Sequence, residues 1–305
     1  MIPTHNRADV LRSCLQAVDA AAAGLEGVEV VVVDDGSRDE TPAVLAATRL
    51  ENASFLTDRT DGRGPATARN LGVRAASSPI VLFLGDDILV EPGLLRRHLE
   101  FHSGGGEAGR AARCLIGEVA LDPSAPQTRF SRFVHSAYQF NPAASAKDGR
   151  LPWHCFHTAN ASMPRQAFLD AGGFDERFPY AAWEDVEFAY RLGKAGVGFY
   201  YDPEAVGFHR HEMTLRSYAA RQERSGRAAA LLLEIHPELA DLVTPRRRLP
   251  GPLRAVLQNR VNVAALTGLA EAAEKCLPER AYRMIVGQVL AYHYYRGMRE
   301  AGGRA

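Results

Sequence analysis

The sequence predicts an α/β protein with a doubly wound, mostly parallel sheet flanked by helices and followed by a C-terminal helical extension. Two observations carry this prediction. Short apolar runs such as Val28–Val33 alternate with amphipathic helical stretches in the first part of the chain, as in parallel sheets that helices cover on both faces. From about residue 217 onward the pattern is helical alone.

Composition agrees with this class and excludes others. The chain has 305 residues, of which 46% are hydrophobic and 24% charged, enough for one large α/β domain with an appendage. Its 36 basic residues balance 36 acidic ones, so a globally basic nucleic-acid binder is not expected. The four cysteines lie far apart without C-x-x-C spacing, which argues against a zinc knuckle or a disulfide framework. With no signal peptide or apolar run of about 18 residues visible, we expect a cytoplasmic protein.

The N-terminal elements follow in order. Residues 1–6 are typical of the end of a strand that enters a loop, which predicts a truncated first strand, with a short first strand as the alternative. Apolar residues at helical spacing predict a helix over 8–23. The β-branched run 28–33 predicts a buried strand, and 39–42 contains the cap residues of another helix.

The later elements are less regular. We expect a helix over 65–76 and a strand over Ile80–Leu84, then a surface loop at 104–106. Residues 122–152 lack clear periodicity, which predicts a mobile segment over the site. Helices are expected over 184–193, 217–233, 253–275 and 279–300, with a Pro/Arg-rich hinge at 244–252. We therefore expect a catalytic domain at 1–225 and a helical extension at 226–305.

Acidic pairs follow two of the predicted strands. Asp34 and Asp35 end one strand, and Asp86 and Asp87 end another. Ligands of such sheets bind beyond the carboxyl ends of the strands, so the two pairs are expected to share one site. Asp86 and Asp87 could hold Mg²⁺ or Mn²⁺, or cap the following helix. Asp34 and Asp35 could accept hydrogen bonds from a nucleobase or ribose, or form an Asx-type turn.

Two further groups carry chemistry. Glu184 and Asp185 follow Trp183 at the start of a predicted helix, where acids are stabilised by the helix dipole but could also act as a general base. His209 and His211 share one face if their segment is extended. A histidine pair is more often a surface or core feature than a metal site.

Several short motifs follow one another in a fixed order along the chain, and the ordered series is more specific than any single motif. The motifs are Pro3-Thr4-His5-Asn6-Arg7; Val33-Asp34-Asp35-Gly36-Ser37 with Asp39 and Thr41; Ala68-Arg69-Asn70-Leu71-Gly72; Phe83-Leu84-Gly85-Asp86-Asp87; Thr158-Ala159-Asn160-Ala161-Ser162; Gly172-Gly173-Phe174-Asp175-Glu176; and Trp183-Glu184-Asp185. Together they resemble a family 2 glycosyltransferase with the GT-A nucleotide-sugar-binding fold. The resemblance covers roughly residues 1–225.

The resemblance implies roles for individual residues. Those that match nucleotide-binding positions are Pro3, Thr4, Asp34 and Asp35 for the base and ribose, Arg69 near the diphosphate, and Asp86 for ribose or metal-bound water. Asp87 matches the metal ligand of a D-x-D motif whose first acid is Gly85 here, and His209 matches an additional metal ligand, with His211 as its competitor. Asp185 matches the general base, beside Glu184, which steadies the loop. Asn160 and the 172–176 turn match positions that shape the sugar and acceptor pocket.

The resemblance also implies an activity. It is an inverting, Mn²⁺- or Mg²⁺-assisted transfer of a hexosyl or related group from a nucleoside-diphosphate sugar to a hydroxyl of a glycan, polysaccharide or lipid-linked acceptor, as in cell-envelope or polysaccharide biosynthesis. A nucleotidyltransferase and a non-catalytic nucleotide-sugar-binding module are the alternatives. The first normally carries a Gly-rich phosphate loop where this chain has Pro3–Arg7, and the second needs no general base.

The C-terminal helices leave two alternatives open. Their tyrosines fit core packing or a homodimer contact. Together with the basic run Arg246–Arg248, they also fit peripheral attachment to the anionic inner face of the plasma membrane, where a lipid-linked acceptor would lie.

Overall fold

The computed structural model describes residues 1–104, 112–139, 142–211, 213–244 and 259–302. The chain divides into two compact units. The first comprises residues 1–126, 139–179 and 184–211, and the second comprises 127–138, 180–183 and 212–305. The boundary expected at residue 225 falls inside helix α8 (Leu215–Ile235), which belongs to the second unit.

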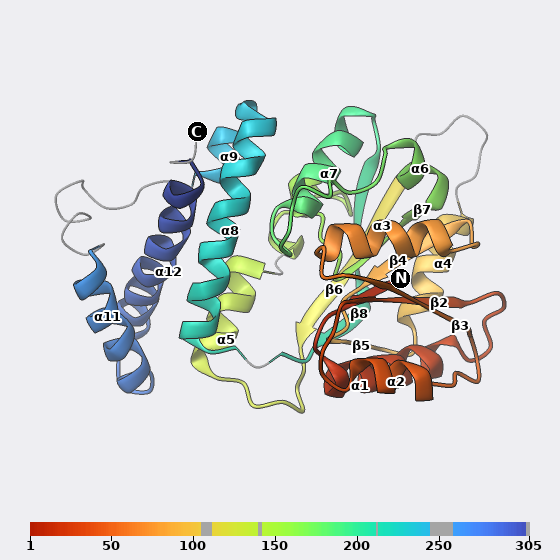
Figure 1. Cartoon of the computed structure of the whole chain (residues 1–305), viewed down its shortest axis with the longest axis horizontal. Coiled ribbons are helices and arrows are strands. Elements are labelled where there is room, and N and C mark those ends of the chain that lie inside the picture. Colours follow the sequence, from red (N-terminus) through yellow and green to blue (C-terminus); the bar gives the residue numbers. More distant parts are fainter. Residues whose placement is uncertain (105–111, 140–141, 212, 245–258, 303–305) are drawn as a thin grey trace. The chain divides into compact units, whose positions relative to one another are not determined.

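The first unit alternates strands and helices along the chain (Figure 1). Its strands are β1 (Ile2–Thr4), β2 (Glu29–Asp35), β3 (Ser54–Thr60), β4 (Ile80–Leu84), β5 (Ile88–Val90), β6 (Arg113–Leu121), β7 (Asn160–Pro164) and β8 (Gly198–His209). Its helices are α1 (Ala8–Ala22), α2 (Thr41–Ala47), α3 (Pro65–Ala75), α4 (Leu94–Ser103), α6 (Arg165–Asp170) and α7 (Glu184–Lys194), with the short turns η2 (Pro142–Ala144) and η3 (Trp153–Cys155). The predicted α/β class is confirmed, with the helices expected at 8–23, 65–76 and 184–193 and the strands expected at 28–33 and 80–84.

The strands form two sheets. The first has the order β1-β2-β3 and is entirely parallel. The second has the order β4-β7-β6-β8-β5 and is mixed, because only β6 and β8 run parallel. The sheets meet where the Leu84 amide donates to the Met1 carbonyl at 3.1 Å. The ends of β1, β2 and β4 therefore lie at neighbouring positions.

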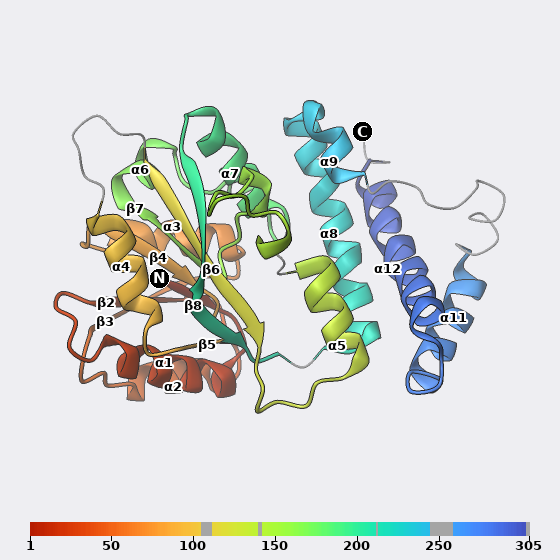
Figure 2. The same cartoon turned by 180° about the vertical axis from the view of Figure 1, so that it is seen from behind.

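Strand β2 explains why helices cover both faces of the first sheet. Alternate residues of a strand point to opposite faces. Val31 and Val33 pack into a core with α3, α6 and α7, whereas Val30 and Val32 pack into a core with α1, α2 and α4. Each fully buried aliphatic side chain contributes roughly 1.5–3 kcal/mol. Figure 2 shows the same layers from behind.

The second unit is helical. It contains α5 (Arg129–Val134), α8 (Leu215–Ile235), α9 (Ala240–Val243), α11 (Arg260–Ala272) and α12 (Glu279–Gly302), with the single turns η1 (His135–Gln139, whose last residue falls in the first unit) and η4 (Pro237–Leu239). Tyr282 and Tyr294 are buried in it, and the Tyr294 hydroxyl donates to the Val243 carbonyl at 2.8 Å. Core packing therefore accounts for these two tyrosines. The run Arg246–Arg248 and most of the expected hinge lie outside the described residues.

Residues 122–152, for which a mobile segment over the site was predicted, include regular structure. Residues 129–134 form helix α5, whose Phe130, Phe133 and Val134 side chains are buried in the core of the second unit. The segment has no clear periodicity because its helices are only one or two turns long, too short for a 3.6-residue pattern to repeat. Within the described ranges, the structure contains no helix that is long and apolar enough to cross a membrane.

Helices α8 and α12 approach each other closely at two glycines. A Cβ added at Gly226 would overlap the Tyr294 carbonyl, and one at Gly297 would overlap the Glu223 carbonyl. We predict that Gly226→Ala lowers the free energy of unfolding by about 1–3 kcal/mol, the usual cost of overpacking. Urea denaturation followed by circular dichroism measures the change.

The matched control is Gly268→Ala in helix α11. A Cβ at Gly268 would meet no atom within 4 Å, so alanine should leave stability unchanged or raise it by up to about 1 kcal/mol through helix propensity. Equal stabilities of the two variants would contradict the close approach of α8 and α12.

Candidate active site

The pair Asp86 and Asp87 occupies the tight turn between β4 and β5. The turn is closed by a hydrogen bond from the Ile88 amide to the Gly85 carbonyl at 3.2 Å. A Cβ at Gly85 would lie 2.8 Å from Asp87 Oδ1. The glycine therefore leaves room for the Asp87 carboxylate. The D-x-D motif alone had indicated only that an acid is missing at this position.

The two carboxylates have different partners. Asp87 Oδ2 lies 2.6 Å from Arg7 Nη1 and 3.4 Å from His209 Nε2. Asp86 Oδ2 accepts a 2.7 Å hydrogen bond from the Thr4 hydroxyl, and its Oδ1 lies 3.8 Å from Arg7 Nη1. The Asp86–Asp87 turn is thus joined to the end of β1 and to the loop that follows it.

These environments separate the two pKa values. Burial and the neighbouring Asp87 charge raise the pKa of Asp86 above its ordinary value. Burial acts in the same direction on Asp87, but the hydrogen bond and charge of His209, together with Arg7, hold the pKa of Asp87 well below its usual range. Asp87 is therefore the more acidic of the two carboxylates.

Strand pairing brings His209 to this turn. In the antiparallel register of β5 and β8, His209 lies opposite Ile88, and the Arg210 amide donates to the Asp87 carbonyl at 2.8 Å. The ring of His211 lies 5.7 Å from that of His209, centroid to centroid, and its Nδ1 is 3.5 Å from Arg7 Nη1. His209 is thus in contact with Asp87, and the charge of His211 also lowers the pKa of Asp87.

The carboxylates at the end of β2 hold the surrounding loops. Asp34 accepts from Arg59 Nη1 and from the Ser37 amide, both at 2.8 Å. Asp35 accepts from the amides of Arg63 and Gly64 at 2.9 Å, just before helix α3, and from the Thr60 hydroxyl. A carboxylate accepts about four hydrogen bonds, so Asp35 keeps some capacity for a ligand. Contact of either acid with a nucleotide stays a prediction.

The loop after β1 is attached to the loop after β2. Half-buried Pro3 pairs with Val33 in the parallel register, and Thr4 pairs with Asp34. The His5 Nδ1 donates to the Asp35 carbonyl at 2.6 Å. Pro3, Thr4, Asp34 and Asp35 therefore gather at one end of the first sheet, as their order in the sequence predicts, although no described contact tests their binding to a base or ribose.

A second charged group lies where α3 meets α7. Arg69 Nη1 and Glu184 Oε1 form a buried ion pair at 2.8 Å, and the Arg69 guanidinium lies over the Phe174 ring, 5.5 Å from its centroid. Because Arg69 is engaged in the interior, the structure offers no support for its predicted contact with a diphosphate. Glu184 acts as the partner of this arginine.

Asp185 follows directly in the first turn of α7. It keeps part of its surface in contact with solvent, but burial and the neighbouring Glu184 charge raise the pKa of Asp185 to about 7. The preceding residue, Trp183, has a φ of 68°, which is rare for a bulky side chain. Strain of this kind is common at functional sites.

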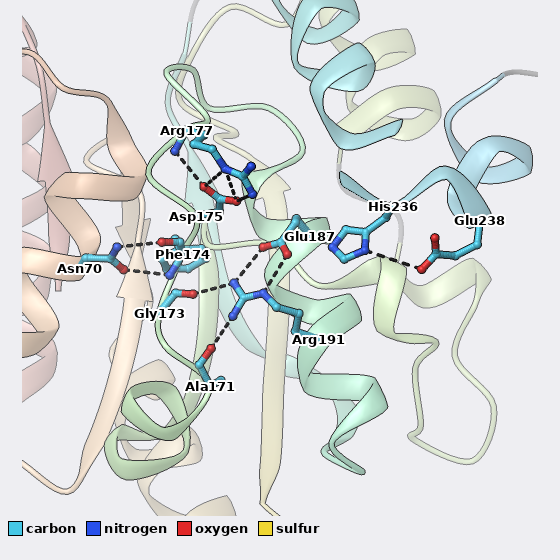
Figure 3. A network of polar contacts seen from close by, with 10 residues as sticks. All are labelled: Asn70, Ala171, Gly173, Phe174, Asp175, Arg177, Glu187, Arg191, His236 and Glu238. Carbon is cyan, nitrogen blue, oxygen red and sulfur yellow. Dashed lines mark hydrogen bonds and ion pairs between the residues drawn. The ribbon is translucent and has the colours of Figure 1, made fainter. Parts of the chain in front are cut away.

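The turn before α7 is held from two sides (Figure 3). Asn70 accepts from the Phe174 amide and donates to the Phe174 carbonyl, both at 2.9 Å. Arg191 forms a two-pronged ion pair with Glu187 at 2.8 Å and donates to the Gly173 carbonyl at 2.6 Å. The sequence analysis did not identify this clamp, although the i, i+4 spacing of Glu187 and Arg191 is a signal of their pairing.

Asn160 lies inside the protein rather than on a pocket wall. Its side chain is fully buried. Its amide donates to the carbonyls of Glu118 at 3.0 Å and Ala205 at 2.8 Å, and its Oδ1 lies 2.9 Å from His98 Nε2. These contacts join β7 to β6 and β8. Any effect of Asn160 on a sugar pocket is therefore indirect.

The Asp87 environment is compatible with a divalent metal that a phosphorylated ligand helps to hold. A carboxylate oxygen and an imidazole nitrogen are ligand types that Mn²⁺ accepts, and Mg²⁺ is commonly held by one or two carboxylates plus substrate phosphates. No group of three His, Cys, Asp or Glu side chains suited to a metal occurs in the described part of the chain. The protein side chains would thus supply only part of the coordination.

Comparison with known proteins identifies the family. The model of glycosyl transferase family 2 matches residues 1–170, more than half of the chain. The chain is 33% identical over 271 residues to a validoxylamine A glucosyltransferase of Streptomyces hygroscopicus subsp. jinggangensis, covering 81% of this chain and 63% of that protein. The chain therefore belongs to glycosyl transferase family 2.

Other relatives and solved structures agree. A pre-mycofactocin glycosyltransferase of Mycobacterium tuberculosis is 29% identical, over 78% of this chain and 48% of its own length. The chain thus spans about half to two thirds of these relatives. The mannosyltransferase PcManGT of Pyrobaculum calidifontis, solved with GDP-Man and Mn²⁺, has a TM-score of 0.56 at 22% identity, with 98% of this chain and 83% of that chain covered. This similarity confirms the GT-A fold.

The position of Gly85 generates a prediction. We expect Gly85→Ala to lower the free energy of unfolding by about 1–3 kcal/mol, because the new Cβ pushes against Asp87 Oδ1 while Arg7 and His209 hold that carboxylate in place. Gly85→Asp should behave in the same way, although it restores a D-x-D sequence. Thermal unfolding followed by circular dichroism measures both.

Gly93→Ala, three residues after the end of β5, is the matched control because a Cβ there meets no atom within 4 Å. If Gly85→Asp were more stable than the native chain, the glycine would not be needed to leave room for the Asp87 carboxylate, and it would simply replace the first acid of a D-x-D motif.

Proposed function

We propose that this chain transfers a sugar from a nucleoside-diphosphate sugar to a hydroxyl acceptor in a single displacement with inversion. The observation that carries the proposal is the environment of Asp185, a carboxylate at the start of α7 whose pKa is raised to about 7. General bases work best when their pKa lies near the working pH. The family membership of the chain leaves the nucleotidyltransferase alternative without support.

In the proposed reaction, the acceptor hydroxyl oxygen attacks the anomeric carbon of the donor. The new bond forms on the face opposite the leaving group, so the configuration inverts. The bond from the anomeric carbon to the diphosphate oxygen breaks, and its electron pair leaves with the nucleoside diphosphate. The acceptor proton passes to the ionised carboxylate of Asp185. No covalent intermediate with the protein is needed.

Asp87 and His209 are the residues that would hold the metal, beside Asp86. The metal would supply positive charge that stabilises the diphosphate leaving group. Thr4 positions Asp86 through its hydroxyl. The solved mannosyltransferase contains both a nucleotide sugar and Mn²⁺, which supports this assignment by analogy of fold.

The donor and acceptor are proposed by class. Pro3, Thr4, Asp34 and Asp35 gather at the strand ends where GT-A proteins bind nucleotides, and a solved TarS structure of this fold, from S. aureus, contains UDP. The relatives reported above are named as a glucosyltransferase for validoxylamine A and a glycosyltransferase for pre-mycofactocin. A carbohydrate or lipid-linked acceptor with a free hydroxyl fits this proposal.

The base assignment predicts the pH dependence of transfer. In the native chain the rate should rise with pH through about 7 and then level off, because protonated Asp185 cannot accept the acceptor proton. Asp185→Asn should lower kcat by about 10²–10⁴-fold while donor binding is kept. Product formation over a pH series and calorimetric donor titration measure the two quantities.

Asp170→Asn is the control, an exposed acid at the end of helix α6 whose loss should change neither quantity. Transfer at the native rate by Asp185→Asn would overturn the base assignment, whatever the metal requirement.

The metal assignment has its own test. Excess EDTA should abolish transfer, and added Mn²⁺ or Mg²⁺ should restore it, with Mn²⁺ favoured by the imidazole ligand of His209. Initial rates after chelation and metal titration measure the effect. An unchanged rate in EDTA would remove the metal from the mechanism and leave the role of Asp185 intact.

A further inference from the structure

Arg7 contacts Asp87, a ligand of the proposed metal site. Its Nη1 lies 2.6 Å from Asp87 Oδ2, the same oxygen that lies 3.4 Å from His209 Nε2. It also lies 3.8 Å from Asp86 Oδ1. The guanidinium therefore serves as counterion to both carboxylates of the β4–β5 turn. Arg7 itself lies in another part of the chain, directly before helix α1.

This contact opposes metal binding through the same oxygen. A guanidinium and a divalent cation repel each other, and the repulsion is strong where protein atoms exclude water. Movement of Arg7 away from Asp87 would therefore favour a metal held by Asp87 Oδ2 and His209 Nε2. Conversely, the ion pair of Arg7 opposes metal binding in the absence of other ligands.

We propose that Arg7 is an exchangeable counterion, which neutralises Asp86 and Asp87 in the metal-free protein and moves to the donor diphosphate when a divalent metal takes its place. The inference rests on the proposed metal-assisted function. It assigns to Arg7 the diphosphate contact that the family resemblance implies for Arg69, and it makes metal and nucleoside diphosphate bind cooperatively.

The exposure of the two arginines supports this exchange. The Arg7 side chain keeps 32% of its surface exposed, whereas Arg69 keeps 9% and is paired with Glu184. Arg7 can leave Asp87 by rotation of its side chain alone, because hydrogen bonds that do not involve Asp87 hold the backbone of its loop in place. The Arg7 amide donates to Thr41 Oγ1 at 3.1 Å, and the neighbouring Asn6 amide donates to Ser37 Oγ at 2.8 Å. A guanidinium also matches the geometry of phosphate oxygens.

The decisive experiment measures Mn²⁺ binding without nucleotide. Free Mn²⁺ is followed by electron paramagnetic resonance in titrations of the native chain, Arg7→Gln and Arg7→Met. We expect both neutral variants to bind Mn²⁺ about tenfold more tightly than the native chain, a factor that corresponds to about 1.4 kcal/mol. Arg7→Lys retains the charge and should stay close to the native affinity.

A second measurement tests the exchange itself. UDP and GDP are titrated by calorimetry with and without Mn²⁺. In the native chain, Mn²⁺ should raise the affinity for UDP or GDP, whichever of the two binds. This increase in affinity should be several-fold smaller in Arg7→Gln, because that variant has no guanidinium that can move to the diphosphate. Arg12→Gln removes the same charge from an exposed position of helix α1 and should match the native chain in both measurements.

The outcomes separate this inference from the function on which it rests. Mn²⁺ affinity that is equal or weaker in both neutral variants would overturn the role of Arg7, while the proposed metal site would stand if the native chain binds Mn²⁺. Absence of Mn²⁺ binding by every variant, both without nucleotide and with UDP or GDP present, would overturn both. Tighter binding with an unchanged nucleotide enhancement would reject the move to the diphosphate.

Discussion

The site depends on one electrostatic constraint, the placement of two adjacent carboxylates at the end of a largely buried strand. Asp86 and Asp87 cannot both be ionised there without compensation, because burial and mutual repulsion favour protonation. The compensation comes from two other segments, through Thr4 and Arg7 at the end of β1 and in the loop after it, and through His209 at the end of β8. Loops that are far apart in the sequence are therefore drawn to one turn, and that turn becomes the centre of the proposed catalytic machinery.

The architecture makes this convergence possible. Parallel pairing of β1 with β2, and the hydrogen bonds that Met1, just before β1, forms with Leu82 and Leu84 of β4, place three strand ends side by side. The antiparallel β8 approaches β5 from the opposite direction, so its last residue, His209, reaches the same turn. Strands β4 and β8 run in the same direction, because each of β4 and β6 is antiparallel to β7 and β6 is parallel to β8. Their carboxyl ends therefore lie at the same edge of the second sheet, which the sequence pattern did not indicate to be mixed.

The sequence predicted which strand ends come together better than it predicted the partners of their side chains. The run Val28–Val33 and the acids that follow two strands identified the fold and the edge where these acids gather, because these signals are local. The pairing of Arg7 with Asp87 joins residues 80 positions apart, and no periodic pattern encodes it. Asn160 illustrates the same limit. Its position in a motif indicated a pocket, whereas only the packing of three strands shows that its amide is consumed inside the sheet.

The two acidic pairs differ in which member receives an arginine. Arg69 lies on Glu184 rather than on Asp185. Burial and the Glu184 charge raise the pKa of Asp185, although the Arg69 charge acts in the opposite direction. Arg7 lies on Asp87 and, with His209, lowers the pKa of that residue. Asp185 can therefore take up a proton near neutral pH, whereas Asp87 stays ionised. A metal ligand must be ionised and a general base must be protonatable, so the two pairs are suited to the different tasks proposed for them.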